Sequence, residues 1–361
     1  MTSPLDAANL RARIQTCVDQ EIAHQRTVLA EVGPDVDDVV AAVETLLAGG
    51  KRLRAAFLYW GYRGAGRPDS PAAIRLATAM EFFQAAALLH DDVMDDSDTR
   101  RGMPAAHRAL AQQHAQRGWE GSPERFGLAG AVLAGNLCLT WADELYATCG
   151  LASEDVARGR ALFDRMRTQL MAGQFLDVVE SVRPWDELST EQRIERAAHV
   201  IRYKSAKYTI EHPLLIGATI GGIDEEDLGH LSTYGLELGH AFQLRDDVLG
   251  VFGDPAQTGK PAGDDVREGK RTVLMAHAMH LAGTSDRALV VDALGRVDLT
   301  GSDVDAVRAI IVESGALAAI EADIDRHALG AREALARGRT VDPEAAAALA
   351  SLIDVATARL A

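Results

Sequence analysis

Apolar residues recur at helical spacing along almost the whole chain. They fall at positions i, i+3, i+4 and i+7, the period at which residues share one face of an α-helix. Alternating apolar and polar runs joined by hairpin turns, which would indicate strands, are absent. The pattern therefore predicts an all-α protein. The expected helices are 7–31, 36–48, 51–63, 71–95, 103–116, 127–149, 153–180, 190–205, 207–220, 225–250, 271–283, 302–316, 318–337 and 343–360.

Glycine, proline, serine and aspartate separate these segments. Most of the breaks are short, and short connections make consecutive helices antiparallel neighbours in a bundle. We therefore expect a single large helical bundle around a central cavity. No linker, repeat or low-complexity segment divides residues 1–361, which favours one domain. The polar stretch 112–126 is expected to form a long loop between two helices.

The bulk composition narrows the class of protein. The 361 residues are 47% hydrophobic, and the net charge of −16 argues against a general nucleic-acid binder. Cys17, Cys138 and Cys149 are an odd number without CxxC spacing, so we expect free thiols in a reducing cytoplasm. The N-terminus lacks the apolar segment of a signal peptide. No apolar run approaches the about 18 residues that span a bilayer, so we expect no transmembrane helix.

The densest group of acidic residues is the sequence HDDVMDDSDTRRG at 90–102, which follows an apolar helical run. At about 100° per residue, Asp91, Asp95 and Asp98 share one helix face. Carboxylates so close together raise one another's pKa unless a cation neutralises them, and hard oxygen ligands suit Mg²⁺. The alternative is a solvated acidic turn at the end of a helix.

A second acidic motif favours the metal hypothesis. The sequence FQLRDDVLGVFGD, at 242–254, places Asp246 and Asp247 after another apolar helical run. Two antiparallel helices facing each other across one cavity would hold metal ions between their carboxylates. Such ions would clamp a diphosphate from both sides.

Basic residues accompany both acidic motifs. Lys51 and Arg54 lie in GGKRLR, at an expected helix start whose free N–H groups also favour anions. Lys204 lies beside the Ser205 hydroxyl. The remaining basic residues of this set are Arg100, Arg101, Lys260 and Lys270. Singly, each is typical of a solvated surface, but together they predict two anion sites, one bridged by metal and one basic.

This set of motifs resembles the all-trans polyprenyl diphosphate synthases, which make farnesyl, geranylgeranyl and longer diphosphates. GGKRLR, DDVMD with RRG, the Lys-Ser pair, FQLRDD and GK…GDD…GK occur in the family's order over about residues 45–280. The joint set is highly specific, whereas DDxxD alone also occurs in terpene cyclases. The resemblance implies an all-α bundle around a deep cavity, a homodimer, and three Mg²⁺ ions.

The resemblance also implies roles for individual residues. Asp91 and Asp95 would ligate two Mg²⁺ ions and Asp246 the third, with Asp92 and Asp247 beside them as direct or water-mediated ligands. The residues implied for the allylic diphosphate are Arg100, Lys204 and Lys260, with Lys270 as a further substrate-binding residue. Those implied for isopentenyl diphosphate are Lys51, Arg54, Arg101 and Gln84. Those implied beside the developing carbocation are Ser205 and Gln243, which form the catalytic group together with Lys204.

The implied activity is that of a prenyltransferase. The allylic C–O bond ionises, the isopentenyl alkene attacks the cation, and a proton is lost to the departing diphosphate. Catalysis would then consist of electrostatic stabilisation in a pocket that excludes water. One departure from the family is Gly250, where many relatives carry a fifth-position aspartate; we expect activity to survive, because the first aspartate is the one expected to touch metal.

Two other functions fit part of the pattern. A class I terpene cyclase shares DDxxD on a helical bundle, but normally carries an Asn/Ser/Glu triad as its second metal site and has no isopentenyl site. A non-catalytic regulatory subunit of a prenyl synthase tends to lose an aspartate motif, and Gly250 is the one feature that favours it.

Product length is expected to depend on the helix before Asp91. Ala87 and Ala86, four and five positions earlier, are small, whereas Phe83 and Met80 follow one turn and two turns further back. One turn rises about 5.4 Å, comparable to one isoprene unit. Obstruction at Phe83 predicts a C20 product, geranylgeranyl diphosphate, with C15 or C25 as neighbours. The alternative is that Phe83 and Met80 only pack between helices.

Two substitutions test this ruler. We expect Ala87→Phe to shorten the product, because it fills the open turn, and Phe83→Ala to lengthen it. Chromatography of the products made from each allylic starter measures both effects. Unchanged product lengths in both variants would contradict the ruler.

Overall fold

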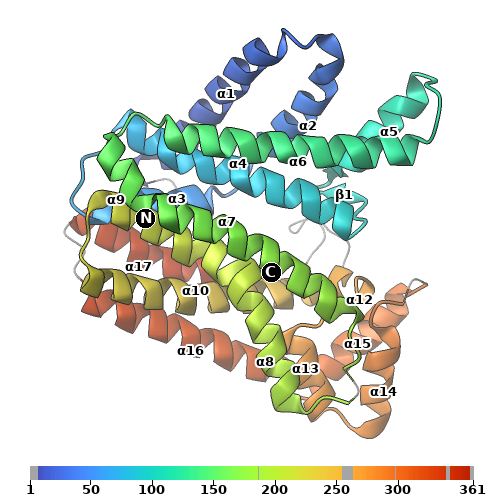
Figure 1. Ribbon diagram of the computed structural model, residues 1–361. Helices are drawn as coiled ribbons and strands as arrows, with labels where there is room; N and C mark the ends of the chain where they lie inside the picture. Colours follow the sequence, from blue (N-terminus) through green and yellow to red (C-terminus); the bar gives the residue numbers. More distant parts are fainter. Residues whose placement is uncertain (1–6, 186, 254–262, 297, 339–341, 358–361) are drawn as a thin grey trace.

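The structure is a computed structural model that describes residues 7–185, 187–253, 263–296, 298–338 and 342–357. In this part of the chain it is helical apart from one very short hairpin, so the expectation of an all-α protein is confirmed (Figure 1). The elements are η1 (Ala7–Asn9), α1 (Leu10–Leu29), η2 (Pro34–Val36), α2 (Asp37–Leu47), α3 (Leu53–Gly64), α4 (Pro71–Met94), β1 (Thr99–Arg100), β2 (Met103–Pro104), α5 (Ala106–Gln116), α6 (Pro123–Ala147), α7 (Ser153–Val182), α8 (Thr190–Val200), η3 (Ile201–Glu211), α9 (His212–Gly221), α10 (Glu225–Phe252), α12 (Asp264–Arg267), α13 (Val273–Leu281), α14 (Thr284–Ala293), α15 (Gly301–Glu313), α16 (Ala316–Arg337) and α17 (Pro343–Thr357).

The structure corrects several expected boundaries. The expected loop over 112–126 is wrong, because α5 continues to Gln116 and the Ser122 hydroxyl caps the start of α6. The hairpin of β1 and β2 turns at Arg101 and Gly102, which both have positive φ. It was not expected because two-residue strands have no detectable alternation. α12 and α14 were not expected either.

Two helices also change the expectation about membrane spans. By length and hydropathy alone, α4 and α6 are long enough and apolar enough to cross a bilayer, so the expectation that no segment reaches that length is wrong. In the most apolar window of α4, 72% is buried inside the protein, and in that of α6, 39%. Such helices are weak evidence for a membrane protein, because core helices pass the same test.

Most helices pack against an antiparallel neighbour. α4 lies against α6, and α10 lies against η3 and α16, while α13, α14 and α15 gather at one end of the molecule (Figure 1). α3 and α9 approach closely because Gly61 and Gly217 face each other's helix. A Cβ at either position would overlap a backbone carbonyl oxygen of the opposite helix.

The buried apolar side chains form two clusters. The larger joins α1–α4, α6, α7, α9, α17 and one side of α10, where Leu238 and Phe242 contribute. The second joins α8 and α13–α16 to the C-terminal end of α10, where Val248 and Val251 contribute. α10 therefore packs into both clusters, which holds its C-terminal turns, with Asp246 and Asp247, in a fixed position.

A buried ion pair fixes the basic segment before α3. Arg52 lies 3.0 Å from Glu81 of α4, and both side chains are almost completely buried. Arg52 also donates to the Leu47 carbonyl and to Gln15 of α1. Breaking a buried pair costs about 3–5 kcal/mol, because one charge is left without its partner. This pair therefore sets the position of Lys51 and Arg54 on either side of Arg52.

Candidate active site

One cavity brings the two acidic motifs together. Its volume is 570 Å³, and its wall includes Asp91 at the end of α4 and Asp246 and Asp247 near the end of α10. The other residues of the expected site in this wall are Lys51, Arg100, Lys204, Ser205, Gln243 and Lys270. Residues far apart in the sequence, acidic and basic, thus face one space.

Lys204 and Ser205 enter this cavity from η3, which has π-helical geometry. Single π segments inside helices recur at functional sites. η3 approaches α7 closely because Gly173 of α7 has no side chain, and a Cβ there would overlap the backbone of Tyr203 and Lys204. This approach places the Lys204 ammonium near the side chains of α7.

The Lys204 ammonium lies between two carboxylates. It is 2.5 Å from Asp177 Oδ2 of α7 and 3.5 Å from Asp91 Oδ1 of α4. Burial alone would lower the pKa of Lys204, but Asp91 and Asp177 raise it above its ordinary value. Gln174 donates a further hydrogen bond to Asp91 Oδ1. The lysine therefore stays charged, and α7 fixes its position against the first acidic motif.

Two aspartates of the first motif have opposite protonation tendencies. Burial acts to raise the pKa of Asp91, but Lys204, Lys270 and Arg100 outweigh it, so the pKa lies below its ordinary value. Burial, and then repulsion from Asp91, raise the pKa of Asp95 to about 6. Negative charge is therefore in excess at this end of α4, a condition that a divalent cation relieves.

Asp92 points to a different partner. Both Nε and Nη2 of Arg100 donate to Asp92 Oδ1, the first at 2.9 Å. Asp92 and Arg100 belong to the wall of a second, smaller cavity of 150 Å³, which also includes Arg101. Arg100 thus lies between the two cavities. The role of Asp92 as a direct or water-mediated Mg²⁺ ligand stays a prediction.

The second motif holds a carboxyl group that is protonated at neutral pH without metal. Asp247 is 5% exposed and accepts a hydrogen bond from Gln243 Nε2 at 2.8 Å. Burial, with repulsion from Asp265 and Asp246, raises its pKa to about 8. Burial and neighbouring carboxylates therefore raise the pKa of an aspartate on the α10 side of the cavity, as they do for Asp95 on the α4 side.

Lys270 connects the acidic groups at the edge of α12. Its ammonium lies 3.3 Å from Asp265 Oδ1 and 2.6 Å from Glu268 Oε2. Burial opposes its charge, but Asp265, Glu268 and Asp95 raise the pKa of Lys270 well above its ordinary value. It is therefore a permanently charged group facing the cavity.

The residues expected to bind the second substrate lie around the start of α3. Arg54 donates to the Thr209 hydroxyl at 2.8 Å and its guanidinium lies 4.4 Å from the centre of the Tyr208 ring. The Tyr208 hydroxyl donates to Gln84. Arg54 and Gln84, far apart in the sequence, are thus joined through Tyr208 of η3.

Arg101 belongs to the same basic region. Its Nη1 donates to the carbonyls of Leu46 and Gly49, at 2.9 and 2.8 Å. Burial, and then the neighbouring Arg52, lower the pKa of Arg101 below its ordinary value. Such an excess of positive charge favours an anion. Lys260, the remaining basic residue of the expected site, lies outside the described residues.

The residues of the expected chain-length ruler are mostly buried. Met80, Phe83 and Ala86 are completely buried, whereas Ala87 is half-buried. The Phe83 ring packs against Tyr208, with centroids 5.6 Å apart, and none of these four side chains is in the wall of either cavity described above. This placement is compatible with the alternative of plain packing, and the ruler stays a prediction.

A polyprenyl synthetase family model matches residues 37–311, which include both acidic motifs and all the basic segments. The chain belongs to the polyprenyl synthetase family. This membership decides against the class I terpene cyclase alternative.

Similar proteins of this family cover most of the chain. A geranylgeranyl pyrophosphate synthase from Corynebacterium glutamicum, in a crystal structure complexed with isoprenyl diphosphate and magnesium, shares 37% identity and has a TM-score of 0.91, covering 97% of this chain and 99% of its own. A geranylfarnesyl diphosphate synthase from Aeropyrum pernix is 32% identical over 324 residues, 89% of this chain and 93% of its own. An octaprenyl diphosphate synthase from Escherichia coli is 34% identical over 252 residues, 67% of this chain and 66% of its own.

Sequence reasoning assigned no role to three polar residues of the polyprenyl synthetase site, although the GDD motif contains the third. Gln174 and Asp177 lie three positions apart on α7, and Asp265 lies on α12. The spacing of the first two, directly after Gly173, was the available signal, because residues at i and i+3 share a helix face. Nothing local in the sequence indicated that α7 would face Lys204.

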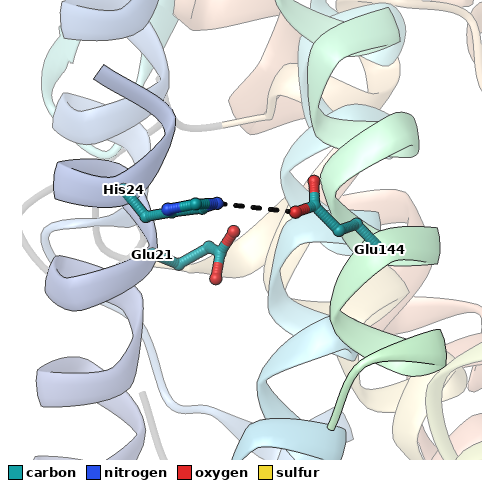
Figure 2. Close-up of side chains that lie close together, drawn as sticks. All are labelled: Glu21, His24 and Glu144. Atoms are coloured by element: carbon teal, nitrogen blue, oxygen red, sulfur yellow. Dashed lines mark ion pairs between the residues drawn. The ribbon is translucent and has the colours of Figure 1, made fainter. Parts of the chain in front are cut away.

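A separate cluster of potential ligand residues joins α1 to α6 (Figure 2). His24 Nε2 lies 3.6 Å from Glu144 Oε1, and Gln25 donates to both Glu21 and Glu144. Arg75 lies 3.2 Å from the buried Glu21 carboxylate. Protein groups therefore already balance these carboxylates, and we assign the cluster to the contact between α1 and α6.

The raised pKa of Asp247 predicts how the metal-free protein responds to pH. The folded carboxyl holds its proton up to about pH 8, whereas the unfolded one releases it at about 4. The contribution of Asp247 to the free energy of unfolding therefore falls as pH rises from about 4 to about 8. We expect Asp247→Asn to raise the melting temperature at pH 8.5 but to change it little at pH 4.5, measured by circular dichroism with chelator present.

Asp92→Asn is the matched control, because Asp92 is paired with Arg100. This variant should lower the melting temperature at pH 8.5. Equal effects of Asp247→Asn at both pH values would contradict the assignment of a buried, protonated Asp247.

Proposed function

We propose that this polyprenyl synthetase condenses an allylic diphosphate with isopentenyl diphosphate head-to-tail and makes a C20 product, with C15 or C25 as neighbours. The observation that carries the proposal is the single cavity lined by Asp91, Asp246, Lys204 and Lys270. Opposed carboxylates with interleaved cations suit a diphosphate bound through metal. The names of the Corynebacterium and Aeropyrum relatives support a product of twenty or twenty-five carbons.

The carboxylates around the cavity fit the chemistry of Mg²⁺. They are hard oxygen donors, and burial together with repulsion from neighbouring carboxylates raises the pKa values of Asp95 and Asp247, which a bound cation would lower again. We propose three ions, held by Asp91, Asp95 and Asp246, with Asp92 and Asp247 close by. When bound, Mg²⁺ neutralises the diphosphate and thereby makes it a better leaving group.

The basic residues of the cavity wall also stabilise the diphosphate. Lys204, Lys270 and Arg100 hold the allylic diphosphate and stabilise the charge that develops on it as the C–O bond breaks. These groups are positioned before the reaction by Asp177, Asp265 and Asp92, so little reorganisation is needed. Lys260, which lies outside the described residues, is proposed for the same diphosphate by resemblance.

Other groups in the wall protect the carbocation. The Ser205 hydroxyl and the Gln243 amide offer oxygen dipoles, and Ala197, Val200 and Ile201 provide an apolar side. Excluding water matters because a water molecule would capture the cation and give an alcohol. The isopentenyl alkene attacks instead, and the departing diphosphate takes the proton that is lost.

The second substrate is proposed to bind in the basic region around Arg54. Lys51, Arg54 and Arg101 provide its positive charge, with Gln84 joined to Arg54 through Tyr208. Arg52 and Glu81 hold this region in place. Lys51 also lines the main cavity, so the two diphosphates would lie close enough to react.

The chain is proposed to be one domain of a homodimer in the cytoplasm. The one-domain proposal is supported by α10, which packs into both hydrophobic clusters. α7 supports the homodimer, because it carries an exposed apolar stripe at the spacing of one helix face. The residues of this stripe are Met171, Phe175, Val178 and Val182. A second copy of the chain is the proposed partner of this stripe, and the burial of α4 argues against a transmembrane role.

Turnover tests the proposed reaction. Purified protein with Mg²⁺, dimethylallyl diphosphate and isopentenyl diphosphate should release pyrophosphate and make a prenyl diphosphate. Asp91→Ala and Asp246→Ala should each lower turnover by about 10²-fold or more, with circular dichroism unchanged. Lys51→Ala should mainly raise the concentration of isopentenyl diphosphate required.

The contradicting outcomes are distinct. No pyrophosphate release by the wild type would favour the non-catalytic regulatory subunit. Unfolding of Asp91→Ala would mean that a structural residue was taken for a ligand. A selective effect of Lys51→Ala on the allylic substrate would mean that the two anion sites are exchanged.

Phe175→Glu tests the homodimer. Phe175 is 69% exposed, so the substitution should leave the fold intact but place charge in the proposed interface. We expect the molar mass from light scattering to fall from that of a dimer to that of a monomer. Leu329→Glu, at a 57% exposed position of α16, is the control and should stay dimeric. A monomeric wild type would overturn the proposal.

A further inference from the structure

The second acidic motif occupies one face of α10. Its residues in the cavity wall recur at i, i+3, i+4 and i+7, the spacing of a single helix face. They are Gln243, Asp246, Asp247 and Gly250. At about 100° per residue, Arg245 projects from the opposite side of the helix. The rotation of α10 about its own axis therefore decides whether the two carboxylates point into the cavity.

The Arg245 guanidinium joins α10 to two other helices. Its Nη1 and Nη2 donate to the two carboxylate oxygens of Glu321 on α16, both at 2.6 Å. Its Nε donates to the Thr357 carbonyl, at the end of α17, at 3.0 Å. Two parallel bonds to a carboxylate fix the direction of a guanidinium as well as its distance. Three donors of one side chain thus hold α10 against two separate elements.

Both helices that Arg245 contacts are fixed by apolar packing. On α16, Ile320 and Ile324 are buried in the second cluster. On α17, Ile353 and Ala356 are buried in the larger cluster. The last carbonyl groups of a helix have no partner inside it, and a positive side chain is favourable there. Arg245 is therefore bound to elements of both clusters, on the side of α10 that faces away from the cavity.

We propose that Arg245 is a positioning residue for the second acidic motif. By binding α16 and α17, it fixes the rotation of α10 that points Asp246 and Asp247 at the metal ions and the diphosphate. Arg245 is not part of the cavity wall, so it acts only through these aspartates. The inference rests on the proposed function, since it concerns the carboxylates that are proposed to bind Mg²⁺.

A second hydrogen bond between α10 and α17 provides a matched control. The hydroxyl of the completely buried Tyr234 donates to the Leu349 carbonyl at 2.8 Å. Tyr234 precedes Asp246 by about 18 Å along the helix axis, at 1.5 Å per residue. This bond joins the same two helices through the same kind of contact, but far from the acidic motif. Both contacts should stabilise the fold, whereas only that of Arg245 should affect the metal ligands.

Substitution of Arg245 and of Tyr234 separates positioning from stability. Arg245→Met keeps an apolar stem and removes the three donors. It should weaken the Mg²⁺-dependent binding of inorganic pyrophosphate, measured by calorimetry on folded protein, by about 10-fold, as expected for a residue that orients a metal ligand. Tyr234→Phe should lower the melting temperature but bind pyrophosphate as the wild type does. A loss of binding in both variants, in neither, or in Tyr234→Phe alone overturns the inference.

Glu321 tests whether Arg245 acts through its contact with α16. Its side chain is 40% exposed, so Glu321→Ala should fold even if Arg245→Met does not. Glu321→Ala should weaken pyrophosphate binding by several-fold, because it leaves Arg245 with only the carbonyl at the end of α17. The double variant should bind no worse than Arg245→Met, since both substitutions remove one contact. Wild-type binding by Glu321→Ala, or additive losses in the double variant, would contradict this pair as the positioning contact.

An exposed ion pair between the same two partner helices is a further control. Arg332 of α16 binds Asp354 of α17, and the two side chains are 49% and 67% exposed. Arg332→Met should bind pyrophosphate as the wild type does. A loss of binding in this variant would mean that any loosening of α16 against α17 disturbs the site, which would overturn a specific role for Arg245.

Turnover distinguishes this inference from the proposed function. In a wild type that condenses the two substrates, Arg245→Met should raise the Mg²⁺ concentration at half-maximal rate and leave the requirement for isopentenyl diphosphate unchanged. A wild type that turns over, with unchanged pyrophosphate binding in Arg245→Met, refutes only the inference. A wild type without turnover, whose Mg²⁺-dependent pyrophosphate binding is weakened by Arg245→Met but not by Tyr234→Phe, refutes only the proposed reaction.

Discussion

Repulsion between buried carboxylates is the constraint on which this site depends. Asp91 of α4 and Asp246 and Asp247 of α10 line one cavity. Burial, and then repulsion from neighbouring carboxylates, raise the pKa of Asp95 to about 6 and that of Asp247 to about 8. Such a cavity favours divalent cations, because they reduce the repulsion between carboxylates on the α4 side and on the α10 side. The bound cations can in turn hold a polyanion.

Other residues of the site fix the positions of the ammonium groups that lie against these carboxylates. α7 holds Lys204 through Asp177, and α12 holds Lys270 through Asp265. Both ammonium groups are thereby kept charged and directed at the cavity. The π-helical geometry of η3 and the close approach at Gly173 belong to the same arrangement, since they bring Lys204 within reach of α7. Electrostatic catalysis requires such groups to be in place before the charge develops.

Much of the architecture was predictable, because helical periodicity and local motifs depend only on residues that are close together in the sequence. The expected segment 71–95 and the observed α4, Pro71–Met94, agree closely, because Ser70 and Pro71 mark its start. The hairpin at 99–104 and the four-residue α12 were missed, since elements so short carry no periodicity. The loop expected over 112–126 was too long, because only residues 117–122 lie between α5 and α6.

By itself, the sequence determined the helical class, the paired aspartates and the basic segments beside them, since each follows from residue type and spacing within one segment. Only the tertiary structure decided which groups meet. It placed Asp92 against Arg100, Lys204 between Asp91 and Asp177, and Asp265 in the space beside Gly250. These contacts join residues of different elements, and their geometry depends on how those elements pack, which no local pattern encodes.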